Sequence, residues 1–187
     1  MEVNPAKPDL AHIRGIALDV DGVLTDGGLW WGPGGEEWKR FCFADIMGIS
    51  LAQRAGIEFA LVSGEDSPLV DRFAAKMHIR HVFKGCREKA AALRDFAAAS
   101  GFPLGELGFM GDDVNDLPAM KIAGSSAAPA GASPDVIARA AFVTKKSGGN
   151  GAVREWIEAI LAARNLDLKE LYQKPHIAQD AGAGGRG

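Results

Sequence analysis

Three short apolar runs in this chain each end in a cluster of polar residues. Residues 13–18 lead into DVDGVLT, residues 57–62 into SGE, and residues 107–110 into GDDVND. Apolar runs of this length, separated by helical stretches, are typical of strands in a parallel sheet that is covered on both faces. Parallel strands end at one edge of a sheet, and open α/β sheets bind their ligands there. The pattern therefore predicts one shared site built from the three clusters.

The whole pattern predicts an α/β fold, a Rossmann-like parallel sheet with helices on both faces. After the first strand, residues 27–40 carry three tryptophans and the turn sequence GPGG, which indicates a small β-hairpin insertion. We expect one domain over residues 1–174 and a flexible Gly-rich tail over residues 175–187. Further strands are expected at 81–83, 124–128 and 141–144, and helices at 45–55, 67–77, 87–100, 117–122 and 151–164.

Composition argues against several classes of partner. The net charge of −3 gives no electrostatic reason to expect nucleic acid. No apolar run approaches the ~20 residues that span a bilayer, and the N-terminal residues lack the layout of a secretory signal. Cys42 and Cys86 have no CxxC or His-rich context, so neither a disulfide framework nor a zinc site is indicated. Two isolated thiols suit a reducing compartment, and we expect a cytoplasmic protein without membrane partners.

The polar clusters are rich in carboxylates. Asp19 and Asp21 lie two residues apart, and such a pair is costly to ionise unless a cation sits between them. Asp112, Asp113 and Asp116 add three more acids, and a set of oxygen ligands favours a hard ion such as Mg²⁺. The alternative is that these residues are helix caps and turn formers, and for Asp116 that alternative stays open.

Three further residues could bind a phosphoryl group. Lys89, near the start of the helix after the third strand, could neutralise a phosphoryl group together with a carboxylate nucleophile. Ser63 and Gly64 could offer a hydroxyl and backbone N–H groups to phosphate oxygens. Taken singly, the lysine could equally be a solvated surface charge and Ser-Gly a simple turn.

Taken together, these residues resemble the haloacid dehalogenase superfamily, whose four motifs occur in order along the chain. They are matched by DVDGVLT with Asp19 and Asp21, by Ser63, by Lys89, and by GDDVND with Asp112, Asp113 and Asp116.

The resemblance implies that Asp19 attacks phosphorus to form an aspartyl-phosphate, while Asp21 acts as general acid and then base. It also implies Mg²⁺ held by Asp19, Asp112 and the backbone carbonyl of Asp21, with Asp113 and Asp116 behind them. An acid at position 21 favours a phosphatase or phosphotransferase over a dehalogenase.

The spacing between motifs leaves no room for a cap domain, because Asp19 and Ser63 are 44 positions apart and Ser63 and Lys89 are 26 apart. The chain thus resembles the capless, tetrameric sugar-acid phosphatases, which act on 3-deoxy-D-manno-octulosonate (KDO) 8-phosphate or on nonulosonate 9-phosphates. The matching segments are DVDGVLTDGGLWW, GEEWKRF, FADIMGI, GDDVNDLPAM and KKSGGNGAVREW. The resemblance implies a homotetramer through the hairpin, and the exposed aromatics expected at Trp30, Trp31 and Trp38 suit an interface. The alternative is an aromatic cluster within one subunit.

The substrate implied is a small acidic sugar phosphate. KDO 8-phosphate phosphatases typically carry an arginine where this chain has Glu65, whereas the nonulosonate enzymes carry a glutamate there and a lysine at the place of Lys76. This favours a nonulosonate (KDN or sialic acid) 9-phosphate, with KDO 8-phosphate of lipopolysaccharide precursor synthesis as the alternative. Glu65 and Lys76 could instead form a surface ion pair of little consequence. Less favoured are a protein or nucleotide phosphatase and a non-catalytic oligomerisation module. The cationic candidates for binding the substrate are Arg72, Lys76 and Arg154.

Overall fold

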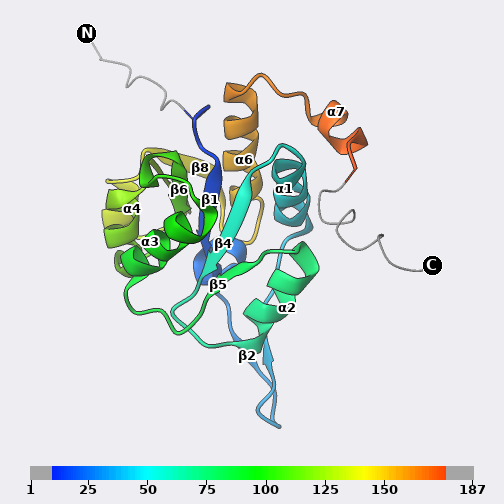
Figure 1. Ribbon diagram of the computed structural model, residues 1–187. Helices are drawn as coiled ribbons and strands as arrows, with labels where there is room; N and C mark the ends of the chain where they lie inside the picture. The colour runs from blue at the N-terminus through cyan, green and yellow to red at the C-terminus, as the bar shows by residue number, and fades with distance from the viewer. Residues whose placement is uncertain (1–9, 176–187) are drawn as a thin grey trace, which may run out of the picture.

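The computed structural model describes residues 10–175, and its centre is a six-stranded parallel sheet (Figure 1). The strands lie in the order β5-β4-β1-β6-β7-β8, and every neighbouring pair is parallel. Their bounds are β1 Gly15–Asp19, β4 Glu58–Val62, β5 His81–Phe83, β6 Leu107–Met110, β7 Ser125–Ala130 and β8 Phe142–Ser147. The expected α/β fold is confirmed.

Helices cover both faces of this sheet. Successive residues of a strand point to opposite faces, so Ile16 and Leu18 of β1 enter one apolar core and Ala17 enters the other. Figure 1 shows α3 and α4 on one side of the strands and α1, α2 and α6 on the other. The first core is closed by α1 (Phe43–Arg54), α2 (Pro68–Met77), α6 (Ala152–Ala163) and α7 (Leu168–Gln173). The second is closed by α3 (Lys89–Ser100), α4 (Leu117–Ile122) and α5 (Pro134–Ile137).

Two short helices, α5 and α7, were not expected from the sequence. Each is too short to show a helical apolar period, but each has a recognisable start. Pro134 occupies the first turn of α5, and the carboxylate of Asp167 accepts hydrogen bonds from the backbone N–H groups of Lys169 and Glu170 at the start of α7. The strands β7 and β8 each begin one residue later than expected, and end two and three residues later.

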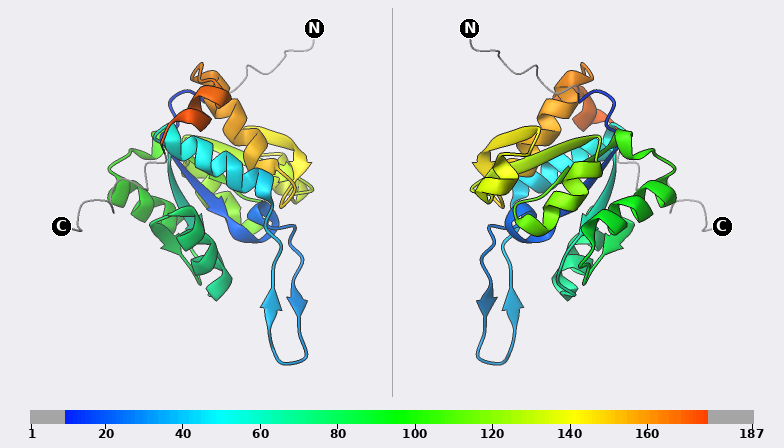
Figure 2. Two further views of the ribbon diagram at one scale, coloured as in Figure 1. Left: turned by 90° about the vertical axis from the view of Figure 1, so that its right-hand side faces the viewer. Right: turned by 90° about the vertical axis from the view of Figure 1, so that its left-hand side faces the viewer.

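The expected hairpin is present and extends away from the body of the molecule (Figure 2). It consists of the antiparallel strands β2 (Trp30–Trp31) and β3 (Glu37–Trp38), joined by a turn in which the N–H of Gly32 donates to the carbonyl of Glu36. The exposed fractions of Trp30, Trp31 and Trp38 in the single chain are 67%, 74% and 52%. These exposures do not fit an aromatic cluster buried within one subunit.

The described part of the chain contains no helix that is both long and apolar enough to cross a membrane. Of the expected tail, only Pro175 lies within the described residues. The expectation that residues 1–174 form one domain stays a prediction, although both cores are built on the same sheet.

Candidate active site

The centre of the sheet is a topological switch point. The chain runs from β1 to β4 on one side and later crosses to β6 on the other, and ligands bind at the carboxyl ends of strands where the order reverses in this way. Asp19 ends β1 and pairs in register with Val62, so that Ser63 follows beside it. Leu18 pairs with Met110, two residues before Asp112. The three polar clusters therefore meet at one edge, as expected.

The turn after β1, Val20–Leu24, depends on glycines from two segments of the chain. Gly22 has φ +86°, in the left-handed region, and a Cβ at this position would overlap the carboxylate of Asp112. The loop after β8 packs beneath the turn: the N–H of Gly149 donates to the carbonyl of Val23 at 3.0 Å. A Cβ at Gly148 would collide with the carbonyl oxygen of Gly22. Close backbone packing thus fixes the turn that connects Asp19 and Asp21.

Three carboxylates converge at the end of β1. Asp19, Asp112 and Asp116 each offer an oxygen, and these oxygens lie within 4.8 Å of one another. Asp19 and Asp116 are buried, and Asp112 is half-buried. The ammonium of Lys89 lies 2.9 Å from Oδ1 of Asp19 and 2.6 Å from Oδ1 of Asp116, so one cation partly neutralises the group. Lys89 itself is buried at the start of α3, which rules out a solvated surface charge.

The pKa values show that this neutralisation is incomplete. Burial, and next the charge of Asp116, raises the pKa of Asp19 well above its ordinary value, although Lys89 opposes the shift. The same two causes raise the pKa of Asp112 to about 6. Burial would lower the pKa of Lys89, but Asp19 and Asp116 outweigh it and raise that pKa, so the ammonium stays charged. A set of oxygen ligands with this shortage of positive charge fits a hard divalent cation such as Mg²⁺.

The three aspartates of the fourth motif, GDDVND, lie in different surroundings: Asp112 and Asp116 belong to the cluster, whereas Asp113 does not. Oδ2 of Asp116 accepts hydrogen bonds from the backbone N–H groups of Asp112 and Asp113, at 2.9 and 3.2 Å, while its other oxygen binds Lys89. Asp116 therefore both takes part in a capping box and orders the cluster. Asp113, which was expected behind the metal ligands, is exposed and accepts from the N–H of Val114.

Ser63 and Gly64, the candidates for binding phosphate, lie directly after β4, beside the end of β1. Ser63 is buried directly after β4, and its backbone is held from both sides, by the carbonyl of Phe83 and the N–H of Cys86. Its Oγ accepts from the N–H of Glu65 at 3.1 Å, which leaves the hydroxyl hydrogen to donate elsewhere. Gly64 is exposed at the same turn.

The carboxylate of Asp21 lies outside the metal cluster and contacts a residue that the sequence analysis missed. Lys39, directly after β3, places its ammonium 2.9 and 3.0 Å from the two oxygens of Asp21 and 2.8 Å from Oε2 of Glu65. Its side chain is only 1% exposed. The side chain of Asp21 does not belong to the cluster of Asp19, Asp112 and Asp116, and metal binding by its backbone carbonyl, which the resemblance implies, stays a prediction. Glu65 pairs with Lys39 and not with Lys76.

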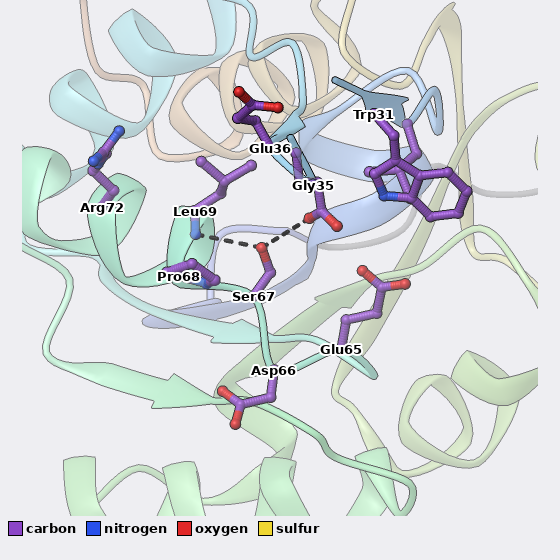
Figure 3. Close-up of a pocket in the computed structure, with 11 residues that line it drawn as sticks. Trp31, Gly35, Glu36, Glu65, Asp66, Ser67, Pro68, Leu69 and Arg72 are labelled. Carbon is purple, nitrogen blue, oxygen red and sulfur yellow. Dashed lines mark hydrogen bonds between the residues drawn. The ribbon is translucent and has the colours of Figure 1, made fainter. Parts of the chain in front are cut away.

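A cleft of about 750 Å³ opens between the hairpin and the start of α2 (Figure 3). Trp31 lies on the hairpin side of this cleft, and Glu65 and Arg72 lie on the side of α2. Among the substrate candidates, Lys76 is exposed one turn further along α2 and does not line the cleft.

The structure does not bring Arg154 to this cleft. Its side chain pairs with Glu158 on α6 and lines a separate depression with Met47 and Tyr172. Its backbone N–H donates to the buried carboxylate of Asp45, which holds the start of α6 against α1. In this arrangement Arg154 anchors the start of its own helix, and its part in binding substrate stays a prediction.

Comparison with known proteins agrees with this geometry. Residues 76–157 match the family of haloacid dehalogenase-like hydrolases. The KDO 8-phosphate phosphatase of Escherichia coli K12 is 39% identical over 153 residues, which cover 82% of this chain and 81% of that protein. The crystal structure of the KDO 8-phosphate phosphatase from Moraxella catarrhalis, in complex with magnesium, phosphate and KDO, matches with a TM-score of 0.82. It is 36% identical, and the match covers 84% of this chain and 90% of that one.

A second solved structure, the cobalt-bound phosphatase of the same name from Haemophilus influenzae, has a TM-score of 0.84 at 36% identity and covers 89% of this chain and 99% of that one. These relatives do not support the expected preference for a nonulosonate 9-phosphate and favour the alternative. The fold shared with the magnesium complex from Moraxella catarrhalis, together with the cluster of three carboxylates, assigns Mg²⁺ as the cofactor. The chain belongs to the KDO 8-phosphate phosphatase family of haloacid dehalogenase-like hydrolases and is a phosphoric monoester hydrolase.

Proposed function

We propose that this enzyme hydrolyses KDO 8-phosphate through a covalent intermediate on Asp19. The observation that carries the proposal is the position of Asp19 at the end of the central strand, buried beside Lys89 and Asp112 and next to the cleft-lining loop after β4. The substrate class rests on the relatives, two of which act on KDO 8-phosphate by name. The expected cytoplasmic location stays a prediction.

In the first half of the reaction, a carboxylate oxygen of Asp19 forms a bond to phosphorus while the bond from phosphorus to the sugar oxygen breaks. Asp21 gives a proton to that leaving oxygen. Lys89 favours the ionised form of Asp19 and orients its carboxylate, and the hydroxyl of Ser63 binds a phosphoryl oxygen. Asp19, Asp112 and the carbonyl of Asp21 would hold Mg²⁺, which would neutralise charge on the transferred group.

In the second half, Asp21 removes a proton from a water molecule whose oxygen attacks the phosphorus of the aspartyl-phosphate. The bond from phosphorus to Asp19 breaks, inorganic phosphate is released, and the carboxylate of Asp19 is restored. The same carboxyl group serves as acid and base because it faces the leaving oxygen and its replacement water in turn. Its separation from the metal cluster suits this role.

The substrate assignment is tested by release of inorganic phosphate from a panel of monoesters. The panel contains KDO 8-phosphate, KDN 9-phosphate, N-acetylneuraminate 9-phosphate, a hexose phosphate and a phosphopeptide. We expect the highest kcat/KM for KDO 8-phosphate. A higher kcat/KM for either nonulosonate 9-phosphate would support the nonulosonate as substrate instead, as the glutamate at position 65 indicates. Equal turnover of all five would defeat any sugar-acid specificity.

The proposed active form is a homotetramer assembled through the hairpin. Three tryptophans that are half-exposed or more on two short strands are unusual for a surface that stays in water. The cleft beside the hairpin lacks a cap domain, and a neighbouring subunit could cover it. Aromatic side chains are enriched at the centres of protein interfaces, which supports this assembly.

A further inference from the structure

Lys39 is a buried cation that the reaction outlined above does not use. It lies at the base of the hairpin, directly after β3, and its side chain is 1% exposed although Trp38 beside it is 52% exposed. A lysine ammonium is rarely buried unless it is paired. One carboxylate would neutralise Lys39, but three lie near its Nζ: Asp21, Glu65 and, at 3.8 Å, Glu37.

The carboxylates around Lys39 come from separate parts of the active site. Asp21 belongs to the turn after β1, and both of its oxygens lie within 3.0 Å of Nζ. Glu65 belongs to the loop after β4 and contacts Nζ at 2.8 Å. Glu37, on the hairpin, accepts a hydrogen bond from Ser67 at the start of α2. One buried ammonium thus ties the hairpin to two loops at the mouth of the site.

Asp21 and Glu65 need such an anchor. Their side chains are 37% and 57% exposed, and an exposed carboxylate can rotate freely in water. An acid that protonates a leaving oxygen must instead be held within hydrogen-bond reach of it. Lys39 can bind one oxygen of Asp21 while the other oxygen carries the proton that is transferred, since an ammonium has three donors.

We infer that Lys39 is a positioning residue, which holds the carboxyl group of Asp21 toward the leaving oxygen and braces it through Glu65. The inference rests on the proposed role of Asp21 as general acid. Lys39 touches neither the nucleophile nor the metal cluster among the contacts described, so it acts through Asp21. It also makes the hairpin, which carries the proposed interface, part of the acid–base machinery.

The test uses leaving groups that differ in their need for a proton. Phenyl phosphate and p-nitrophenyl phosphate have similar shapes, but the phenolate of the first is much the more basic leaving group. The measured quantity is the ratio of kcat/KM for p-nitrophenyl phosphate to kcat/KM for phenyl phosphate, because kcat/KM reports steps up to departure of the leaving group. We expect Lys39→Met to raise this ratio about tenfold, and Asp21→Asn to raise it at least as much, since general acid catalysis contributes about 10²–10⁴-fold.

Lys84→Met is the matched control. Lys84 also binds two carboxylates, Asp66 at 2.7 Å and Asp71 at 2.6 Å, but it does not contact Asp21 in the described structure. We expect the ratio of Lys84→Met to equal that of the wild type. Lys39→Arg retains the charge, so its ratio should lie between those of the wild type and Lys39→Met. If Lys39→Met does not fold, the ratio of Lys39→Arg is compared with that of the wild type instead. Thermal melting and Mg²⁺ calorimetry establish that each variant is folded and binds metal.

The double variant separates positioning from a general structural role. If Lys39 acts through Asp21, adding Lys39→Met to Asp21→Asn will not lower kcat/KM for phenyl phosphate further. A wild-type ratio in Lys39→Met, with a raised ratio in Asp21→Asn, would overturn the inference and leave the proposed function intact. A wild-type ratio in Asp21→Asn would overturn the acid role itself, and the inference with it.

Discussion

The ammonium of Lys89 lies 2.9 Å from Oδ1 of Asp19, and the two side chains are 2% and 7% exposed. A solvent-exposed pair of this kind contributes little to the free energy of folding, but leaving a buried charge without its partner lowers the stability of the protein. Here the lysine is the only described cation in direct contact with the acidic cluster, which also contains Asp112 and Asp116. The contact between Lys89 and Asp19 therefore contributes to the stability of the metal-free site and favours the ionised form of the nucleophile, against burial and the charge of Asp116.

Replacement of Lys89 by methionine is expected to lower kcat about 10²–10³-fold, because one fixed charge at the transferred phosphoryl group is lost. In the metal-free protein the free energy of unfolding should fall by about 3 kcal/mol, since the cluster loses its partner. Phosphate release and urea unfolding in EDTA measure the two effects. Lys84→Met, which removes a more exposed lysine, should change both quantities little. A Lys89→Met enzyme with near wild-type kcat would contradict the assigned role.

Replacement of Asp19 by asparagine should abolish phosphate release, with kcat lowered on the order of 10⁴-fold or more, because the nucleophile is lost. The fold should survive, since burial disfavours the ionised form of Asp19 and an amide of the same shape has no charge to bury. We expect the melting temperature without metal to be unchanged or higher, and the increase on adding Mg²⁺ to shrink. Retention of most activity in the variant would remove Asp19 from the mechanism.

The sequence predicted the sheet and the main residues of the site for a physical reason. Strands that are buried on both faces must be apolar, and parallel strands end together, so the clusters after β1, β4 and β6 had to meet. Lys39 could not be found in this way. The residues around Lys39 are those of a solvent-exposed hairpin. The side chain of Lys39 becomes buried only because the base of the hairpin packs against Asp21 and Glu65. Arg154 lies away from the cleft, because sequence proximity to a Gly-rich loop does not fix the direction of a helix side chain.

Mg²⁺ binding should weaken in acid. Burial and the charge of Asp116 raise the pKa of Asp112 to about 6 in the metal-free protein, and Mg²⁺ requires the ionised carboxylate. Below that pH a proton competes with the metal, so the apparent Kd should rise by up to about tenfold per pH unit, and by more where Asp19 is also protonated. Metal-free stability should fall as the pH rises from about 4 to about 6, because the unfolded chain ionises first.

Calorimetric titrations of Mg²⁺ between about pH 5 and pH 8, combined with urea unfolding in EDTA, follow both trends. Asp135→Asn is the control, since Asp135 is exposed on α5 and pairs with Arg139, outside the cluster. It should keep the wild-type pH dependence. A Kd for Mg²⁺ that stays constant down to about pH 5 would show that Asp112 is ionised throughout this range.

The proposed assembly depends on the hairpin. Replacement of Trp30, Trp31 and Trp38 together by serine should shift the sedimentation coefficient from that of a tetramer to that of a smaller species, because the apolar surface of the interface is lost. Tyr172→Ser is the control, since Tyr172 is 61% exposed on α7. A wild-type protein that sediments as a monomer would reject the tetramer outright.

Gly22 offers a test of how tightly the backbone turn and the metal cluster are joined. Gly22→Ala must place an alanine at φ +86°, which costs about 1–2 kcal/mol, and its Cβ would overlap the carboxylate of Asp112. Gly101→Ala introduces comparable strain at φ +73° after α3, where a Cβ would meet nothing within 4 Å. Both variants should therefore lose stability through backbone strain, and Gly22→Ala should lose at least as much as Gly101→Ala, as measured by urea unfolding. Only Gly22→Ala should also weaken Mg²⁺ binding and lower kcat, because only its methyl group displaces a metal ligand. Equal kinetics in the two variants would mean that the turn relaxes without disturbing Asp112.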